Sequence, residues 1–158
     1  MHDKIKEHAL VKSFHQNYLS YEYKGKSIKL PAVHVKLINP INNNSFKTFA
    51  LVDSGATVSF LPWEFVNILN LKIGESSSAT GAGGEFDTNL STILIEVTKV
   101  TSVQYRDEIQ IHIPKEIELP YAILGRNSIF LYFNILFREN EQDIVFRQIK
   151  HKKVSYKV

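Results

Sequence analysis

Three short motifs hold the residue types that could carry chemistry. The first reads Asp53-Ser54-Gly55-Ala56-Thr57 and directly follows an apolar run, residues 49–52. A buried strand that ends in a carboxylate, a hydroxyl and a glycine delivers the acid to a turn that another chain can approach closely. Asp-Ser-Gly is also a common turn sequence, because Asp and Ser bond their own backbone and Gly adopts positive φ. By itself, this motif leaves both a reactive carboxylate and an ordinary turn open.

The second motif is a glycine-rich segment about 25 residues further along the chain. It reads Thr80-Gly81-Ala82-Gly83-Gly84-Glu85 and stands between two segments that favour strands. Three glycines within four residues predict a flexible hairpin tip with no side chains to obstruct a ligand beneath it. A lid over a cleft, a phosphate-binding loop and a loop without a role are all open. A dinucleotide-binding loop is excluded, because Phe86 stands where its third glycine would be.

The third motif reads Ala122-Ile123-Leu124-Gly125-Arg126-Asn127, an apolar strand that runs into a glycine. Each motif alone is unspecific, but the three together, in this order, closely resemble the retropepsin-like aspartic proteases, both viral and cellular. The resemblance covers roughly residues 33–149. It implies a small closed β-barrel of the acid-protease type, with one or two short helices.

The resemblance implies a role for each residue of the first two motifs. Asp53 would be the catalytic aspartate, Ser54 the hydroxyl residue that interlocks two active-site loops, and Gly55 the residue whose carbonyl faces the substrate backbone. Ala56 and Thr57 would complete the loop that binds the substrate backbone. The four residues of the flap tip would be Gly81, Ala82, Gly83 and Gly84.

The resemblance also covers the third motif and the C-terminal region. Gly125 would pack beneath the catalytic loop, and Arg126 matches the arginine that follows this glycine in viral members. Viral enzymes usually place an aspartate where this chain has Thr57, so the partner of Arg126 and one substrate contact stay open. The hairpin expected over residues 134–149 is more similar to cellular and bacterial members, in which the equivalent region helps to build a dimer interface.

A dimer is also expected from chemistry. Attack of water on a peptide carbonyl needs one carboxylate to accept a proton and one neutral acid to donate to the carbonyl oxygen. Two acids about 3 Å apart share a proton and do both jobs. The other aspartates are Asp3, Asp87, Asp107 and Asp143, and none of them is followed by Ser-Gly or Thr-Gly. We therefore expect a homodimer in which each copy supplies Asp53 and an extended peptide or protein substrate lies beneath the flap as an added strand.

The elements that must position these motifs are mostly strands. Short runs rich in Val, Ile, Thr, Tyr and Phe predict them: residues 17–23, 28–38, 46–52, 90–97, 103–113 and 144–149. Two short helices are expected, one beginning at Pro62 and one over residues 126–132. The composition suits one domain of 158 residues with 44% apolar residues. We divide it into an N-terminal extension, partly ordered (1–24), a protease domain (25–150) and a basic tail (151–158).

Several other functions lack support in the sequence. The chain has no cysteine, and its six histidines include no i, i+4 pair, so neither a metal nor an organic cofactor is expected. The net charge is only +3 and the basic excess lies in the tail, which argues against nucleic-acid binding. Residues 1–11 do not resemble a signal peptide, and residues 121–137 are too polar to span a bilayer. We expect a cytoplasmic protein with no membrane partner.

These expectations define two hypotheses, and they also leave open a protease that belongs to a larger processing system and cleaves only one partner. The first is a homodimeric aspartic endopeptidase in which Asp53 of each chain acts as general acid and base. The alternative is a peptide-binding or scaffolding module that keeps the fold and has lost hydrolysis. Intact Asp53, Ser54 and Gly55 favour the first, because a binding module has no need of a carboxylate pair that costs stability when both acids ionise. Thr57 and the unmatched N-terminal segment keep the second open.

Overall fold

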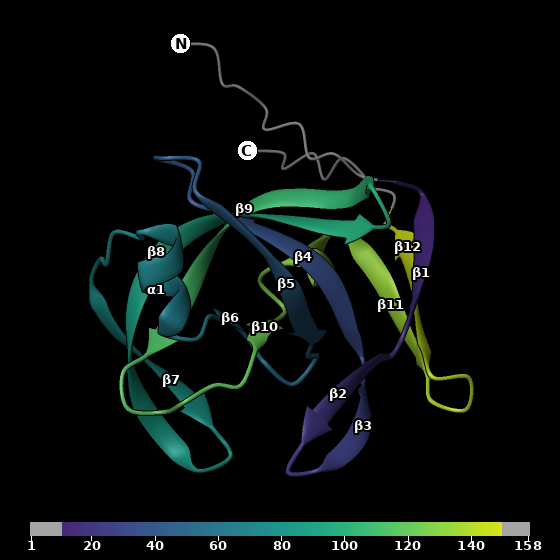
Figure 1. The fold of residues 1–158 in the computed structure, drawn as a ribbon, viewed down its shortest axis with the longest axis horizontal. Coiled ribbons are helices and arrows are strands. Elements are labelled where there is room, and N and C mark those ends of the chain that lie inside the picture. The colour runs from purple at the N-terminus through teal and green to yellow at the C-terminus, as the bar shows by residue number, and fades with distance from the viewer. Residues whose placement is uncertain (1–10, 150–158) are drawn as a thin grey trace, which may run out of the picture.

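The computed structural model describes residues 11–149, and it confirms the prediction of a mostly β chain (Figure 1). Two short helical segments interrupt the strands, α1 (Glu64–Leu69) and the 3-10 segment η1 (Ile129–Leu131). The strands are β1 (Ser13–Asn17), β2 (Leu19–Tyr23), β3 (Lys26–Leu30), β4 (Ala32–Ile38), β5 (Ser45–Val52), β6 (Ser59–Phe60), β7 (Ser76–Gly81), β8 (Gly84–Lys99), β9 (Ser102–Pro114), β10 (Ala122–Leu124), β11 (Phe133–Arg138) and β12 (Asp143–Gln148).

The main sheet has the strand order β4-β5-β10-β6-β9-β8-β7, and β8 also pairs with β4. The pairing from β4 to β8 therefore returns to its starting strand, with β7 attached outside this ring. Side chains alternate between the two faces of each strand. In β4, Val33, Val35 and Leu37 are buried whereas His34 is exposed. The enclosed face holds most of the hydrophobic core, to which β8 and β9 contribute fully buried isoleucines.

Two predicted elements differ from the structure. The strand expected over residues 28–38 is two strands, β3 and β4, separated at Pro31, which has no N–H for a ladder and whose carbonyl accepts a bond from Val52 N–H (2.9 Å). Of the helix expected over residues 126–132, only the 3-10 segment η1 is present. There the Ser128 hydroxyl donates to the Gly125 carbonyl (2.7 Å), and the Asn127 side chain bonds neighbouring strands. Such side-chain bonds to the backbone compete with helix formation.

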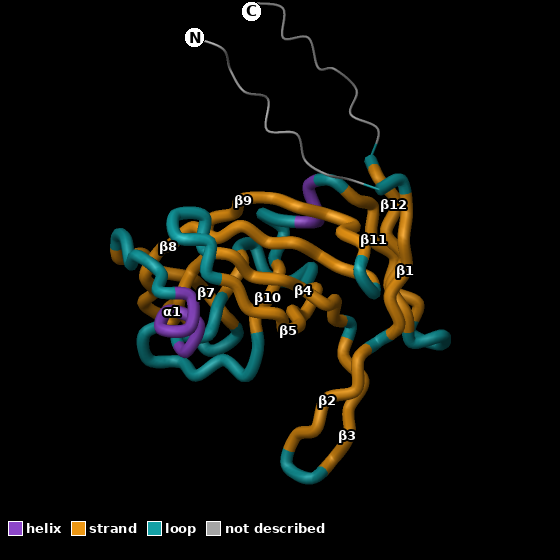
Figure 2. Tube along the Cα trace, turned by 45° about the horizontal axis from the view of Figure 1, so that its top comes forward, coloured by secondary structure: helices purple, strands orange, loops and turns teal. Residues whose placement is uncertain are grey.

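The N-terminal residues within the described range belong to sheets. β1 pairs antiparallel with β12 in a three-stranded sheet of order β1-β12-β11, where Phe14 stacks on Phe146 with ring centroids 4.3 Å apart. β2 and β3 form a separate two-stranded hairpin that stands away from the other strands (Figure 2). The boundary predicted after residue 24 falls in the turn of this hairpin, where Lys24 and Gly25 both have positive φ. The predicted basic tail, residues 151–158, lies outside the described residues.

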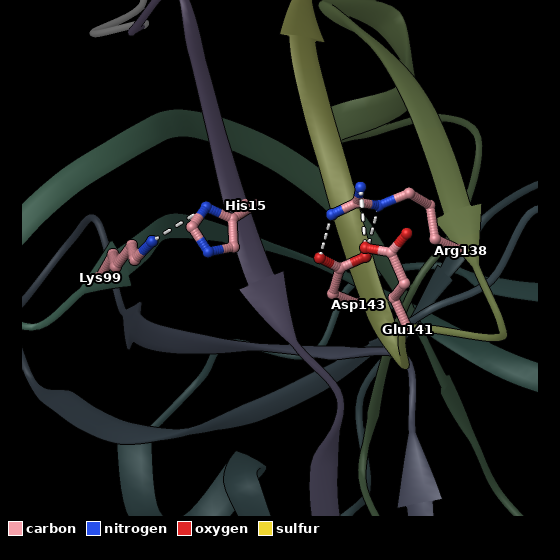
Figure 3. Close-up of polar contacts among 5 residues, drawn as sticks. All are labelled: His15, Lys99, Arg138, Glu141 and Asp143. Atoms are coloured by element: carbon pink, nitrogen blue, oxygen red, sulfur yellow. Dashed lines mark hydrogen bonds and ion pairs between the residues drawn. The ribbon is translucent and has the colours of Figure 1, made fainter.

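The predicted C-terminal hairpin is confirmed as β11–β12, and an ion-pair cluster joins its two strands near their connection (Figure 3). Arg138 lies opposite Asp143 in the register and binds both of its carboxylate oxygens, with Nε 2.7 Å from Oδ1. The same guanidinium lies 2.9 Å from the exposed carboxylate of Glu141. The hydrogen bond from Arg138 lowers the pKa of Asp143 below its ordinary value of 3.8, although burial acts in the opposite direction.

This lowered pKa predicts an acid-dependent loss of stability. A carboxylate whose pKa is lower in the folded state stabilises the fold above its unfolded pKa, and the contribution is lost as the pH falls from about 4 through the folded value. We expect Asp143→Asn to be less stable than wild type at pH 7. Below pH 4, its free energy of unfolding should change less with pH than that of wild type. Urea unfolding from pH 2 to 7 measures this. Glu141→Gln is the matched control, and an equal effect of both changes would contradict the assignment.

Among residues 11–149, no helix has the length and apolar character needed to cross a membrane.

Candidate active site

Asp53 lies where two neighbouring strands of the main sheet end. β5 and β10 are parallel, with Ala122 beside Ala50 and Leu124 beside Val52. Because parallel strands end at the same edge of a sheet, the first and third motifs of the sequence meet there. The backbone N–H of Asp53 donates to the Leu124 carbonyl (3.0 Å), which fixes the residue to the neighbouring strand. In the sequence, only the family resemblance led us to expect the third motif beneath the Asp53 loop.

The carboxylate of Asp53 both shapes its own turn and faces solvent. Its Oδ1 accepts a bond from Gly55 N–H (2.8 Å), and its backbone carbonyl accepts one from Ala56 N–H (3.3 Å). Asp53 is half-buried, and within residues 11–149 no donor bonds its second carboxylate oxygen. The two interpretations of Asp-Ser-Gly are therefore compatible, since one oxygen holds the turn and the other is open to water or to a second acid.

Gly125 supports the loop that carries Asp53, because nothing larger fits there. A Cβ at this position would lie 2.2 Å from the Val58 carbonyl oxygen and 2.8 Å from that of Ala56. The neighbouring Arg126 N–H donates to the Ala56 carbonyl (2.8 Å). The loop from residue 53 to 58 thus rests directly on the backbone of the third motif.

A small polar network beneath this contact was missed by sequence reasoning. The Ser59 hydroxyl accepts a bond from Gly125 N–H (3.0 Å) and donates to the Asn127 Oδ1 (2.7 Å). The Asn127 amide in turn donates to the Gln110 carbonyl (3.1 Å). Asn127 stands within the third motif, but no sequence signal distinguished Ser59. The network ties β6 and β9 to the turn after β10.

Arg126 does not line the groove described below. It is exposed, and within the described residues no carboxylate lies at ion-pair distance from its guanidinium. Thr57 is also exposed. Among residues 11–149, the structure therefore places no acid beside Arg126.

A groove of about 370 Å³ connects the Asp53 loop to the tip of the β7–β8 hairpin. The loop contributes Asp53 and residues 55–57, and the hairpin contributes residues 79–82. Its walls are apolar: Phe60, Phe86, Ile117, Leu119 and Ile123. Five predicted site residues lie outside this lining: Ser54, Gly83, Gly84, Gly125 and Arg126. Ile117 and Leu119 had no sequence signal, because they lie in an irregular segment without periodicity.

The glycine-rich segment forms the tight hairpin tip that the sequence predicts. Gly81 pairs with Gly84 across a two-residue connection, Ala82-Gly83. Gly84 has a φ of +108°, a conformation that residues with a Cβ rarely adopt. Gly83 has open space around it, because a Cβ added there would meet no atom within 4 Å. The hairpin thus brings almost bare backbone over the groove.

Asp53 is the only ionisable side chain among the described residues that line the groove. The aromatic ring of Tyr121 lies nearby, and its pKa is raised, first by burial and then by the charges of Tyr21 and Asp53. Beside Phe60, burial lowers the pKa of His112, whose Nδ1 lies 2.9 Å from the Thr88 hydroxyl. The site therefore offers one carboxylate in apolar surroundings, with a neutral histidine behind its wall.

Among residues 11–149, no group of three His, Asp or Glu side chains is arranged to hold a metal ion.

The comparisons with known proteins give only structural similarities. No protein-family model matches the sequence, and no curated protein sequence matches it. The chain is similar to the EIAV protease in complex with the inhibitor HBY-793, with 23% identity and a TM-score of 0.43 over 67% of this chain and 88% of that one. It is also similar to the simian foamy virus (mac) protease, with 15% identity and a TM-score of 0.43 over 62% and 90% of the two chains. These similarities assign no role to any residue here.

The contact at Gly125 yields a matched pair of glycine variants. Gly125→Ala forces a Cβ against backbone oxygens and should lower the free energy of unfolding by about 3 kcal/mol. Gly83→Ala, at a site with open space, should change it by less than about 0.5 kcal/mol. Urea unfolding monitored by circular dichroism compares the two. Equal midpoints would show that the loop does not rest on Gly125 as described.

Proposed function

We propose that this chain is a retropepsin-like aspartic endopeptidase whose active site is completed by a second copy. The observation that carries the proposal is the position of Asp53: a lone carboxylate in an apolar groove, at the ends of two parallel strands and beneath a glycine-rich hairpin. The ring of strand pairings from β4 to β8 supports a closed barrel of the acid-protease type. The β11–β12 hairpin, extended by β1, favours the cellular and bacterial members over the viral ones.

The mechanism needs two copies of Asp53 that share one proton. The ionised carboxylate removes a proton from water while the oxygen of that water attacks the peptide carbonyl carbon. The protonated carboxyl group of the other copy donates its proton to the carbonyl oxygen, which gives a tetrahedral diol. The diol then collapses: the carboxyl group that took the proton of water gives it to the amide nitrogen, and the other carboxylate takes a proton from a diol hydroxyl as the C–N bond breaks. The pair again holds one proton and returns to its starting state. The open oxygen of Asp53 is suited to this exchange.

The groove favours an extended peptide with apolar side chains near the cleaved bond. Phe60, Phe86 and Ile123 offer apolar surface on the floor and walls, while the hairpin tip offers backbone groups. A strand-like substrate can bond to such backbone groups, and its alternate side chains can enter pockets. This arrangement supports a flap role for Gly81–Gly84, because small residues would let the hairpin close over the bound chain.

The alternative, a peptide-binding module without hydrolysis, is favoured by one observation. Arg126 has no carboxylate partner among the described residues, and Thr57 stands in place of an acid. A site without this acid would bind the substrate backbone through fewer charged contacts. Both functions use the same groove, so cleavage decides between them.

Asp53→Asn tests the chemistry directly. We expect the wild-type protein to cut a diverse peptide pool between about pH 4 and pH 7, the range of a carboxylate pair that shares a proton. The variant should lose about 10²- to 10⁴-fold in rate, the usual contribution of acid–base catalysis. Mass spectrometry identifies the cuts. Asp87→Asn, the same change at an exposed acid outside the groove, is the control. Folded wild-type dimers that cut nothing would favour the binding module.

A mixing experiment tests whether both copies of Asp53 are needed. When equal amounts of wild-type and Asp53→Asn chains assort at random, half of the wild-type chains enter mixed dimers. Activity per wild-type chain should then fall to about half, because a mixed dimer has one carboxylate. The rate of cleavage of a fluorogenic peptide, before and after equilibration of the mixture, gives the ratio. An unchanged rate would show that a single chain, or a single Asp53, is sufficient.

A further inference from the structure

One hairpin has no part in the groove: β2–β3, residues 19–30, here called the arm. Its two strands pair only with each other among the described elements. It projects on the same side of the sheet as the β7–β8 hairpin and stands clear of the other strands (Figures 1 and 2). A two-stranded hairpin is only marginally stable in water unless one face is packed. The arm therefore needs a surface to cover it.

The arm has an apolar face that is covered at its base and bare at its tip. Leu19 lies opposite Leu30, and Tyr21 lies opposite Ile28, so these side chains share one face with Tyr23. Leu30 is only 9% exposed, but Ile28 is 40% exposed and Tyr23 is 51% exposed. The opposite face carries polar and charged side chains: Ser20, Glu22, Ser27 and Lys29. Such a face near the tip is typical of a contact surface.

Aromatic contacts attach the base of the arm to the strands that carry the active site. The ring of Tyr21 lies 5.9 Å from that of Phe49 in β5 and 5.3 Å from that of Tyr121, just before β10. β5 and β10 end at Val52 and Leu124, directly before Asp53 and Gly125. The arm is thus held beside the Asp53 loop. A second copy that brings its own Asp53 to within a few ångströms must pass close to it.

The charges of the arm complement those of the loop on the groove wall. Near its tip the arm carries Lys24 and Lys26, both exposed. The segment from residue 115 to 120 contributes two apolar side chains to the groove. Its exposed Glu116 and Glu118 outnumber its one base, Lys115. In a two-fold interface each patch of one copy meets a complementary patch of the other. A basic arm and an acidic loop in the same chain satisfy this requirement.

We propose that the arm is the element that binds a second copy of this chain. Its apolar tip, Tyr23 and Ile28, packs on the partner beside the partner's Asp53 loop, and Lys24 and Lys26 face the partner's acidic segment, residues 115–120. This inference rests on the proposed function, because the need for a second Asp53 is what brings the partner to this side of the molecule.

The first test removes the apolar tip. Tyr23→Ser with Ile28→Ser should raise the dimer dissociation constant at least about tenfold, as expected for the loss of buried aromatic and aliphatic anchors. Sedimentation equilibrium measures the constant. Ile41→Ser with Val100→Ser is the matched control, because both residues are highly exposed (77% and 92%) in turns away from the arm, and it should leave association unchanged. All four side chains are exposed, so circular dichroism should show folded chains.

The second test reverses charges. Lys24→Glu with Lys26→Glu should weaken the dimer about tenfold or more at low salt, because it brings like charges together across the interface. Adding Glu116→Lys with Glu118→Lys to the same chain should restore much of the association. The restoration should shrink at high salt, where exposed charges are screened.

The outcomes separate this inference from the proposed activity. If the arm variants associate as tightly as wild type, the inference about the arm is wrong. If the variants associate normally but have a higher Michaelis constant for peptides, the arm binds substrate and the inference is also wrong. A wild-type chain that stays monomeric also overturns it. If the arm controls association but the wild-type dimer cuts no peptide, the arm is supported and proteolysis is wrong.

Discussion

The contact of Gly125 with the loop from residue 53 to 58 is the constraint on which the site depends. With only 2.2 Å between a would-be Cβ and the Val58 carbonyl oxygen, the two backbones touch without a side chain between them. This closeness lets Arg126 N–H reach the Ala56 carbonyl and Ser59 reach Gly125 N–H. Each bond fixes one point of the loop, so Asp53 is held by the backbone and its carboxylate keeps one oxygen open. A carboxylate positioned in this way loses little entropy when it reacts.

Under the proposed function, the groove is one half of an active site. It contains one acid, apolar walls and a backbone-rich hairpin, so it does not by itself supply both a base and an acid. The proposed self-association through the arm would bring a second acid to it. The proposed dimer contact and the proposed catalytic residue would then be attached to the same strands, because the ring contacts of Tyr21 link the arm to β5 and to the residue before β10.

Sequence reasoning located the motifs better than it located their supports. The turns at Asp53, at the hairpin tip and at Gly125 could be located because glycines follow or separate strand-like runs, whereas the roles of these residues came only from the family resemblance. A strand was expected before the glycine-rich segment, but β7 was missing from the predicted strand ranges because Ser76, Ser77 and Ser78 have little strand preference. They form a strand because β8 provides a partner. Ser59 and the groove residues Ile117 and Leu119 depend on contacts between distant segments. Such contacts leave no periodic signal, and the expected helix after Gly125 gave way to side-chain bonds for the same reason.

The length of β8 has a mechanical consequence. Its first residues pair with β7 at the hairpin tip, whereas residues 94–98 are paired on both sides, with β4 and β9. The β7–β8 hairpin is therefore anchored at its base in the main sheet. Its tip can bend most easily between residues 84 and 87, which pair only with β7, because β9 holds β8 from residue 88 onward. Strain from a bound chain would pass down β8 into the same wall that carries β5, and so toward Asp53.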